Sequence, residues 1–188
     1  MTSANVGVYT APPFDLGPMP GDRAMCTVDA QLVRAPLEHI FALAADVEAW
    51  PRHLSHYRYV TFRERRADGG GIVDMAAKRP FGPVSWPVWW RSEMHVDPNA
   101  HVVRFRHIGG ITTGMDVAWT FRDEPAGTHV EIVHVWNGPP IPLFGRLAAV
   151  TVIGPVFIHG VASRTLAGLA RVAERTSSSF SPLPSVHS

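Results

Sequence analysis

Three polar side chains lie on segments that also carry large aromatic residues. These three are the first candidates for a chemical role. His134 alternates in phase with Ile132 and Trp136, so it shares their face of a strand. An imidazole titrates near neutral pH and can move a proton to or from a bound molecule. The same pattern also fits a structural histidine that is bonded to a neighbour. Tyr57 and Ser92 lie in similar surroundings, and each needs a polar partner if it is buried without a ligand.

Several common catalytic patterns are missing from the sequence. Among the ten histidines, the close pair His53 and His56 lacks the i, i+4 helical spacing and nearby acid of a zinc site. Gly69-Gly70-Gly71 predicts a tight turn, because no Lys-Ser/Thr pair and no helix follow it. No G-x-S-x-G elbow or dinucleotide fingerprint is present. The sequence therefore predicts neither a metal ion nor another cofactor.

Composition limits the class of protein. The 188 residues include 17 Lys+Arg against 16 Asp+Glu, a net charge of +1 that disfavours binding to nucleic acid. The hydrophobic content of 46% is enough for the core of one domain. The single cysteine, Cys26, lies in an apolar alternation, which predicts a buried thiol in a reducing, cytoplasmic location. The first residues contain neither a basic leader nor a continuous apolar stretch, so no secretory signal is predicted.

One apolar segment, Ile141–Ala162, needs separate treatment because it resembles a membrane helix. Arg146, Pro155 and His159 interrupt it, and the longest uncharged run is shorter than the roughly 20 residues that span a bilayer. We expect a buried helix that can touch a membrane without spanning it.

The ends of the chain differ in composition from its middle. Residues 1–22 are rich in proline and glycine, which predicts a flexible N-terminal arm. Residues 176–188 form a Ser/Pro-rich tail that is expected to be disordered. A single domain is therefore expected over 23–175.

The first elements of this domain are a strand and two short helices. A period of two places Cys26, Val28, Ala30 and Leu32 on the core face of the strand. The following segment, from Pro36 to Trp50, is amphipathic, and Pro51 is expected to interrupt it and give two short helices.

Six further strands are expected between turns rich in glycine, proline and aspartate. They cover Tyr57–Arg66, Ile72–Lys78, Val84–Val96, Ala100–Ile108, Gly114–Arg122 and Thr128–Asn137. Without helices between them, these strands should pair as an antiparallel meander. Helices are then predicted over Phe144–Ile153 and Val156–Arg175, separated at Gly154-Pro155. The result is an α+β fold with a seven-stranded curved sheet.

A bent sheet covered by one long helix leaves space between the two layers. Its inward apolar surface exceeds what a single helix can touch, so large aromatic residues fill the interior or a ligand occupies it. The sequence supplies six tryptophans and nine phenylalanines for either outcome. We expect an apolar cavity.

Four sequence elements carry a family pattern. They are Asp46-Val47-Glu48-Ala49-Trp50-Pro51, Trp90-Arg91-Ser92, Ala118-Trp119-Thr120-Phe121-Arg122 with Ala126-Gly127-Thr128, and the closing helix Arg164–Glu174. Together they resemble the polyketide cyclase/dehydrase group of the START-like (SRPBCC) superfamily, and most closely its aromatic polyketide aromatase/cyclases. The resemblance implies a helix-grip fold, with the sheet closed around the C-terminal helix. It also implies a cavity that binds a poly-β-ketone and promotes aldol ring closure and loss of water. Coenzyme-Q-binding and lipid-carrying relatives share the same skeleton.

The resemblance also carries residues over by position. It places in the pocket Trp50, Tyr57, Trp90 and Ser92. The family's catalytic arginine falls on Met94, which can neither donate a hydrogen bond nor stabilise an oxyanion. Arg91 has the opposite strand parity, so it should point away from the cavity unless a bulge intervenes.

Two functions of different class remain open. The protein binds an apolar or aromatic small molecule, such as a lipid, quinone or polyketide, or it is a cyclase or dehydratase that uses Tyr57, Ser92 and His134. A monomer and a homodimer are both consistent with the sequence, and the N-terminal arm either caps the cavity mouth or lies on a neighbouring subunit. The expected ligand-binding residues are Trp50, Tyr57, Trp86, Trp90, Ser92, Met94, Met115, Val117, Trp119, His134, Trp136 and Phe157.

Overall fold

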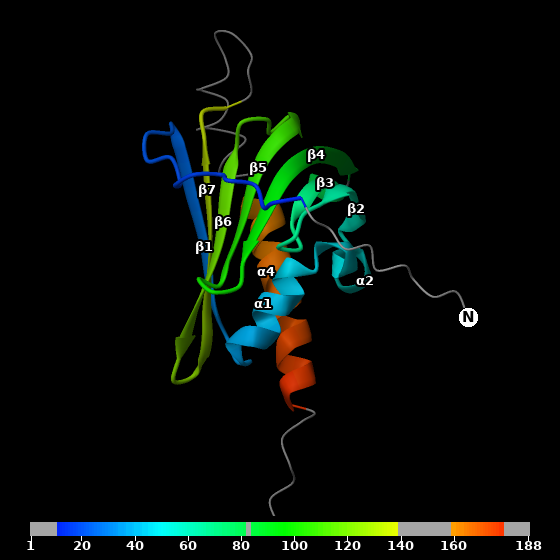
Figure 1. The fold of residues 1–188 in the computed structure, drawn as a ribbon. Coiled ribbons are helices and arrows are strands. Elements are labelled where there is room, and N and C mark those ends of the chain that lie inside the picture. The colour runs from blue at the N-terminus through cyan, green and yellow to red at the C-terminus, as the bar shows by residue number, and fades with distance from the viewer. Residues whose placement is uncertain (1–10, 82–83, 139–158, 179–188) are drawn as a thin grey trace, which may run out of the picture.

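The computed structural model describes residues 11–81, 84–138 and 159–178, and it leaves out the side chains of residues 79–86 and 159 (Figure 1). All pairings in its sheet are antiparallel, in the order β1-β7-β6-β5-β4-β3-β2. The strands are β1 (Met25–Val33), β2 (Tyr57–Arg65), β3 (Gly71–Phe81), β4 (Val84–Asp97), β5 (Val102–Gly110), β6 (Asp116–Glu124) and β7 (Gly127–Trp136). The helices are α1 (Leu37–Ala45), η1 (Val47–Ala49), α2 (Trp50–His53) and α4 (His159–Ser178). The predicted α+β helix-grip fold is confirmed.

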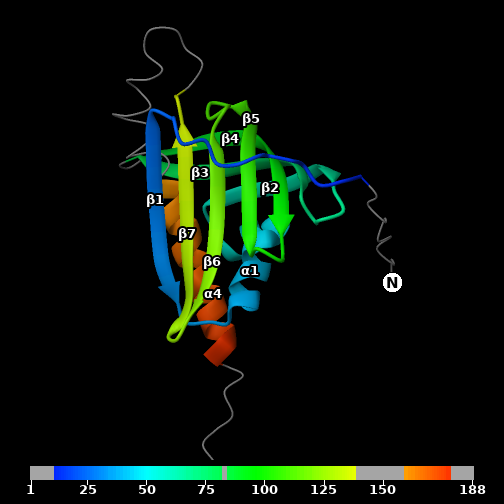
Figure 2. The same cartoon turned by 60° about the vertical axis from the view of Figure 1, so that its left-hand side comes forward.

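Helix α4 lies on the concave side of the sheet, together with α1 (Figures 1 and 2). Its apolar stripe is buried at Ala162, Leu166, Leu169 and Ala173, as the helical period predicts. Gly168 lies beside Leu54, and any side chain at this position would overlap the leucine. The helix continues to Ser178, three residues past its expected end. The predicted helix over 144–153 and the expected start at 156 lie outside the described residues.

The two short helices are separated at Asp46 rather than at Pro51. The main-chain N–H of Asp46 donates to Ala42 O at 3.0 Å and ends α1. Pro51 instead lies in the first turn of α2, where its missing N–H leaves no helical hydrogen bond unmade. The expectation that this proline interrupts the helix is therefore wrong.

Strand β1 presents the opposite face to the one expected from its alternation. Val28 is 53% exposed and Cys26 is also exposed, whereas Met25 and Val33 are buried at the two ends of the strand. The reason is the pairing with β7, because residues paired across antiparallel strands share a face. Met25 pairs with Trp136, so the apolar inner face of β7 fixes which face of β1 turns inward. The predicted burial of the Cys26 thiol is wrong.

The described part of the N-terminal arm runs across the outer side of the sheet (Figure 2). Arg106 Nη2 donates to Leu16 O at 2.7 Å, and Arg104 Nη1 donates to Gly17 O at 3.1 Å. Leu16 is buried there. This part of the arm is separated from α4 by the sheet, so it does not cap a cavity on the concave side.

Among the described helices, none combines the length and the apolar content that a membrane span requires.

Candidate functional site

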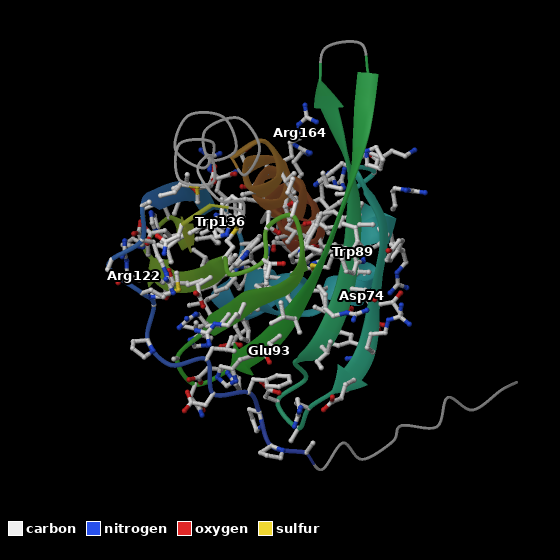
Figure 3. The ribbon with its side chains drawn as sticks, turned by 90° about the horizontal axis from the view of Figure 1, so that it is seen from above. Asp74, Trp89, Glu93, Arg122, Trp136 and Arg164 are labelled. Atoms are coloured by element: carbon white, nitrogen blue, oxygen red, sulfur yellow. The ribbon has the colours of Figure 1, made fainter. Side chains whose placement is uncertain are left out.

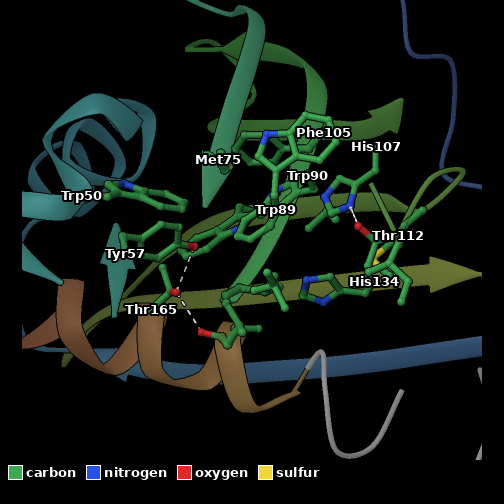
Figure 4. Close-up of a pocket in the computed structure, with 18 residues that line it drawn as sticks. Trp50, Tyr57, Met75, Trp89, Trp90, Phe105, His107, Thr112, His134 and Thr165 are labelled. Carbon is green, nitrogen blue, oxygen red and sulfur yellow. Dashed lines mark hydrogen bonds between the residues drawn. The ribbon is translucent and has the colours of Figure 1, made fainter. Parts of the chain in front are cut away.

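A cavity lies between the concave face of the sheet and α4 (Figure 4). The centre of a water molecule can reach about 90 Å³ of it. One water needs roughly 10–15 Å³ on this measure, so several waters or a small ring can enter. Its wall is built by inward residues of β2 to β7, the loop between β5 and β6, Trp50 of α2 and one face of α4.

Aromatic rings form one continuous part of this wall. Trp50 packs edge-on against Tyr57 at a centroid distance of 5.3 Å and lies 5.7 Å from Trp119. Trp90 stacks on His107 with centroids 6.0 Å apart and an interplanar angle of 23°. The indole N–H of Trp50 donates to a backbone carbonyl at 3.0 Å. The polar atom of this ring is thus satisfied, and an apolar surface remains for a ligand.

One end of the cavity holds a hydrogen-bonded hydroxyl pair. Tyr57 is the first residue of β2, and its Oη lies 3.3 Å from Oγ1 of Thr165 on α4. His56 Nε2 lies 3.1 Å from the same Oγ1. Burial raises the pKa of the Tyr57 hydroxyl, an effect partly offset by the bond to Thr165. Tyr57 therefore stays protonated and can donate a hydrogen bond.

The other end holds two imidazoles, His107 of β5 and His134 of β7 (Figure 4). Burial lowers the pKa of His134 to about 4. Burial lowers the pKa of His107 to about 3, with a smaller contribution from repulsion by His134 when that ring is protonated. Nδ1 of His107 is 2.7 Å from the hydroxyl of Thr112, whereas Nδ1 of His134 has no hydrogen-bond partner among the described residues. Both rings are neutral at physiological pH, and His134 retains a free polar atom.

No charged side chain is found among the described residues that line the cavity. Arg91 is not part of the cavity lining, and its Nε donates at 2.6 Å to Asp74 on the other face of the sheet. Asp74 is labelled in Figure 3. The expectation that Arg91 points away is confirmed, although a bulge does occur between Arg91 and Ser92. The described part of the chain also contains no group of three or more His, Cys, Asp or Glu residues that could hold a metal ion.

Comparison with known proteins identifies the family. Residues 33–152 match the family model described as polyketide cyclase/dehydrase and lipid transport. The chain belongs to this family. The predicted resemblance is thereby confirmed.

Solved structures share the fold of this polyketide cyclase/dehydrase family member. A protein from Thermus thermophilus has a TM-score of 0.68 and 22% identity, over 81% of this chain and 99% of its own. The Zhui aromatase/cyclase from a Streptomyces species has a TM-score of 0.66 and 16% identity, over 84% and 99% of the two chains. A START superfamily protein from Mycobacterium smegmatis has a TM-score of 0.57 and 16% identity, over 83% and 99%. At these identities the likeness establishes the fold.

Most of the predicted site residues of this family member lie at the cavity. Those that line it are Trp50, Tyr57, Trp90, Met115, Val117, Trp119 and His134. Ser92, Met94 and Trp136 are buried but are not part of the cavity lining. The hydroxyl of Ser92 has no partner among the described residues, and Trp136 Nε1 donates to Thr113 O at 3.0 Å. The side chains of Trp86 and Phe157 lie outside the described residues.

Other lining residues were not predicted from the sequence. They are Met75, Val88, Trp89, Phe105, His107, Ile111, Thr112, Ile132, Val161, Ala162 and Thr165. Strand parity could have identified Ile132 as a lining residue, because it is in phase with His134. Parity is ambiguous for His107, because charged and apolar residues occur on both faces of β5. Thr112 in a loop and Thr165 beside the apolar stripe of α4 have no sequence signal.

Proposed function

We propose that this protein binds an uncharged, apolar or aromatic small molecule in the cavity between the sheet and α4. The observation that carries the proposal is an aromatic wall without a charged side chain among the described lining residues. A charged ligand would lose its hydration there without gaining a counter-charge. Membership of the polyketide cyclase/dehydrase and lipid transport family supports a ligand-binding or cyclase role in general. A quinone, a lipid chain or an aromatic polyketide fits this chemistry.

The cavity also favours a flat or slender ligand. About 90 Å³ is open between rings that already contact one another. A planar ring can slide between such rings at stacking distance, whereas a bulky group would have to displace them. We expect the aromatic or unbranched end of the ligand to enter first.

Mass spectrometry of molecules that co-purify with the chain, followed by calorimetric titration, tests this function. The probes are 2-naphthol, menadione and 1-hexadecanol, which are all uncharged at neutral pH. Ala162→Leu fills the cavity from α4 and should weaken binding about tenfold or more, because overpacking a close-packed site is unfavourable. Ala167→Leu, on the same helix but away from the cavity lining, should leave affinity within about twofold. Binding that is equally tight in both variants would place the ligand elsewhere.

A second candidate function is a polyketide aromatase/cyclase or dehydratase. It is favoured by two residues that line the same cavity, Tyr57 with a donor hydroxyl and His134 with an Nδ1 that has no hydrogen-bond partner among the described residues. The neutral imidazole can accept an α-proton while the hydroxyl donates to the developing oxyanion. Ser92 has less support as a catalytic group, because it is not part of the cavity lining.

Turnover of a poly-β-ketone tests the second candidate. Tyr57→Phe should lower the rate at least tenfold, whereas Tyr59→Phe, an exposed tyrosine on the same strand, should not change it. An unchanged rate in Tyr57→Phe means that the assignment of Tyr57 is wrong.

Cytoplasmic location and a monomeric or homodimeric state remain predictions. An exposed, unpaired thiol at Cys26 is consistent with a reducing compartment.

A further inference from the structure

A row of three side chains connects the surface of the molecule to the cavity. His56 is partly exposed, Thr165 is buried on α4, and Tyr57 is buried with its ring on the cavity wall. Oγ1 of Thr165 lies 3.1 Å from His56 Nε2 and 3.3 Å from Tyr57 Oη. Figure 4 shows the bond between Thr165 and Tyr57 at the end of the cavity opposite His134. His56 also borders a surface groove that Arg164 and Arg171 line.

We propose that His56, Thr165 and Tyr57 form a proton path between solvent and the bound molecule, through which the protein catalyses enolisation of a bound ketone. This inference rests on the proposed binding function. The Tyr57 O–H bond breaks as its proton moves to the carbonyl oxygen of the ketone. Thr165 then transfers its hydroxyl proton to Tyr57, and the His56 imidazolium transfers its Nε2 proton to Thr165. The α-proton of the ketone leaves to water or to Nδ1 of His134, and solvent reprotonates His56.

Because Tyr57 is buried, the proton that it gives to a ligand has to be replaced from Thr165. A tyrosinate in this apolar site would be costly, and the raised pKa of Tyr57 expresses that cost. The proton that Tyr57 gives to a ligand must therefore be replaced as it leaves. Thr165 is the hydrogen-bond partner that the structure provides for Tyr57.

Thr165 can pass a proton to Tyr57 because its hydroxyl hydrogen can rotate. At rest it donates to Val161 O, one turn earlier on α4, at 2.8 Å. The same hydrogen can instead donate to Oη of Tyr57 at 3.3 Å, while Oγ1 can accept a hydrogen bond from a protonated Nε2 of His56 at 3.1 Å. Rotation of the hydroxyl from Val161 O to Tyr57 makes Thr165 the donor that the transfer requires. Thr165 acts through Tyr57 and is thus a positioning residue in this scheme.

The charges around His56 determine the pH at which the path operates. Burial and then the charge of Arg164 lower the pKa of His56 below 6.5. Arg171 of α4 and His53 of α2 border the same groove, and the main-chain N–H of Lys78 on β3 donates to His56 O at 2.6 Å. Because only the protonated imidazole can deliver a proton, ketone exchange should accelerate as pH falls from 7.5 toward the pKa of His56.

Deuterium exchange of 2-tetralone in D2O, followed by NMR from about pH 5 to 7.5, measures this activity. Calorimetry measures its dissociation constant separately. We expect Thr165→Val and His56→Gln each to lower the pH-dependent rate at least tenfold. The affinity of His56→Gln should stay within about twofold, because His56 does not line the cavity. Thr165→Ser keeps the hydroxyl and should retain most of the rate. His53→Gln, a neighbouring exposed histidine outside the path, is the matched control.

The double variant Thr165→Val/His56→Gln should be no slower than either single variant, because the two residues act in series. Bound 2-tetralone that exchanges no faster than in buffer, or a Thr165→Val variant with the wild-type pH profile, would overturn the path. If 2-tetralone does not bind, the proposed function fails for this probe. The path is then judged without ligand, from the exchange of the Tyr57 hydroxyl proton with solvent by NMR. That exchange should be slower in Thr165→Val, and equal rates would refute the path.

Discussion

The outer face of the sheet carries buried carboxylates with charged partners, whereas the described cavity side carries polar groups without charge. On the outer face, Asp74 accepts hydrogen bonds from Arg63 at 2.7 Å and from Arg91 at 2.6 Å. The bond from Arg91 is the largest of the effects that lower the pKa of Asp74. On the inner face, His107 and His134 have no charged partner, and burial keeps them neutral. Partly exposed arginines can hold a buried carboxylate in its charged form, while an enclosed site without a counter-charge suppresses ionisation.

The largest expected effect comes from placing a charge on the inner face. Val117 of β6 is 4% exposed and lines the cavity, so Val117→Lys should cost about 3 kcal/mol or more of unfolding free energy. Thr120→Lys puts the same charge on the outer face of the same strand, opposite Glu131, and should change stability by less than about 0.5 kcal/mol. Urea unfolding measures both variants. Similar losses in the two would mean that the faces do not differ in their tolerance of charge.

The next effect is a loss of stability in mild acid. The pKa of His134 is lowered in the folded protein, so the unfolded chain binds more protons below pH 6.5, and unfolding becomes easier as pH falls. From pH 6.5 to 5 this should cost about 2 kcal/mol for His134, and a comparable amount for His107. Carboxylates such as Asp74 contribute only near and below pH 3.8.

Substitution of one histidine isolates its share of this pH dependence. His134→Gln should remove about 2 kcal/mol of the loss between pH 6.5 and 5, measured by urea unfolding at both pH values. His129→Gln, on the outer face of the same strand, is the matched control. An unchanged slope in His134→Gln would show that the imidazole binds its proton equally well in the folded and the unfolded chain.

Removal of two buried hydroxyls, one at a time, should change stability by smaller amounts and in opposite directions. The hydroxyl of Thr128 donates to Ala35 O at 2.8 Å, whereas that of Ser92 has no partner among the described residues. Ser92→Ala should therefore be neutral or stabilise the protein by up to about 1 kcal/mol, and Thr128→Val should destabilise it by about 1–2 kcal/mol. Thermal unfolding of both variants is the measurement. Destabilisation by Ser92→Ala would show that the serine hydroxyl has a partner, such as a buried water.

The sequence predicted the sheet well because turn residues and strand periodicity are local signals. Each strand was expected within a few residues of its position, and the inner face of β7, from Val130 to Trp136, followed from its period of two. The face of β1 could not be read in the same way. The alternation within β1 predicts that Val28 faces the core. The pairing with the more apolar inner face of β7 instead decides which face of β1 turns inward.

The aromatic part of the candidate site was largely predictable, whereas its polar contacts were not. The family pattern places Trp50, Tyr57 and Trp90 in the pocket, and all three line the cavity. Thr165 meets Tyr57 only because the fold brings α4 to the start of β2, where a hydrogen bond joins residues 108 positions apart. No local pattern encodes such a meeting. The positions of His107 and Thr112 likewise depend on the loop between β5 and β6.

The smallest expected effect concerns Cys26, on the outer face of β1. Cys26→Ser should change the unfolding free energy by less than about 0.5 kcal/mol, because the thiol is exposed and its replacement leaves no cavity. As the single cysteine of the chain, it can be followed by a thiol reagent in native buffer. Its modification rate should approach that of the unfolded chain, and Cys26→Ser should abolish the signal. Slow modification limited by unfolding would instead place the alternating residues of β1 on the inner face, and the register with β7 would then have to shift by one residue.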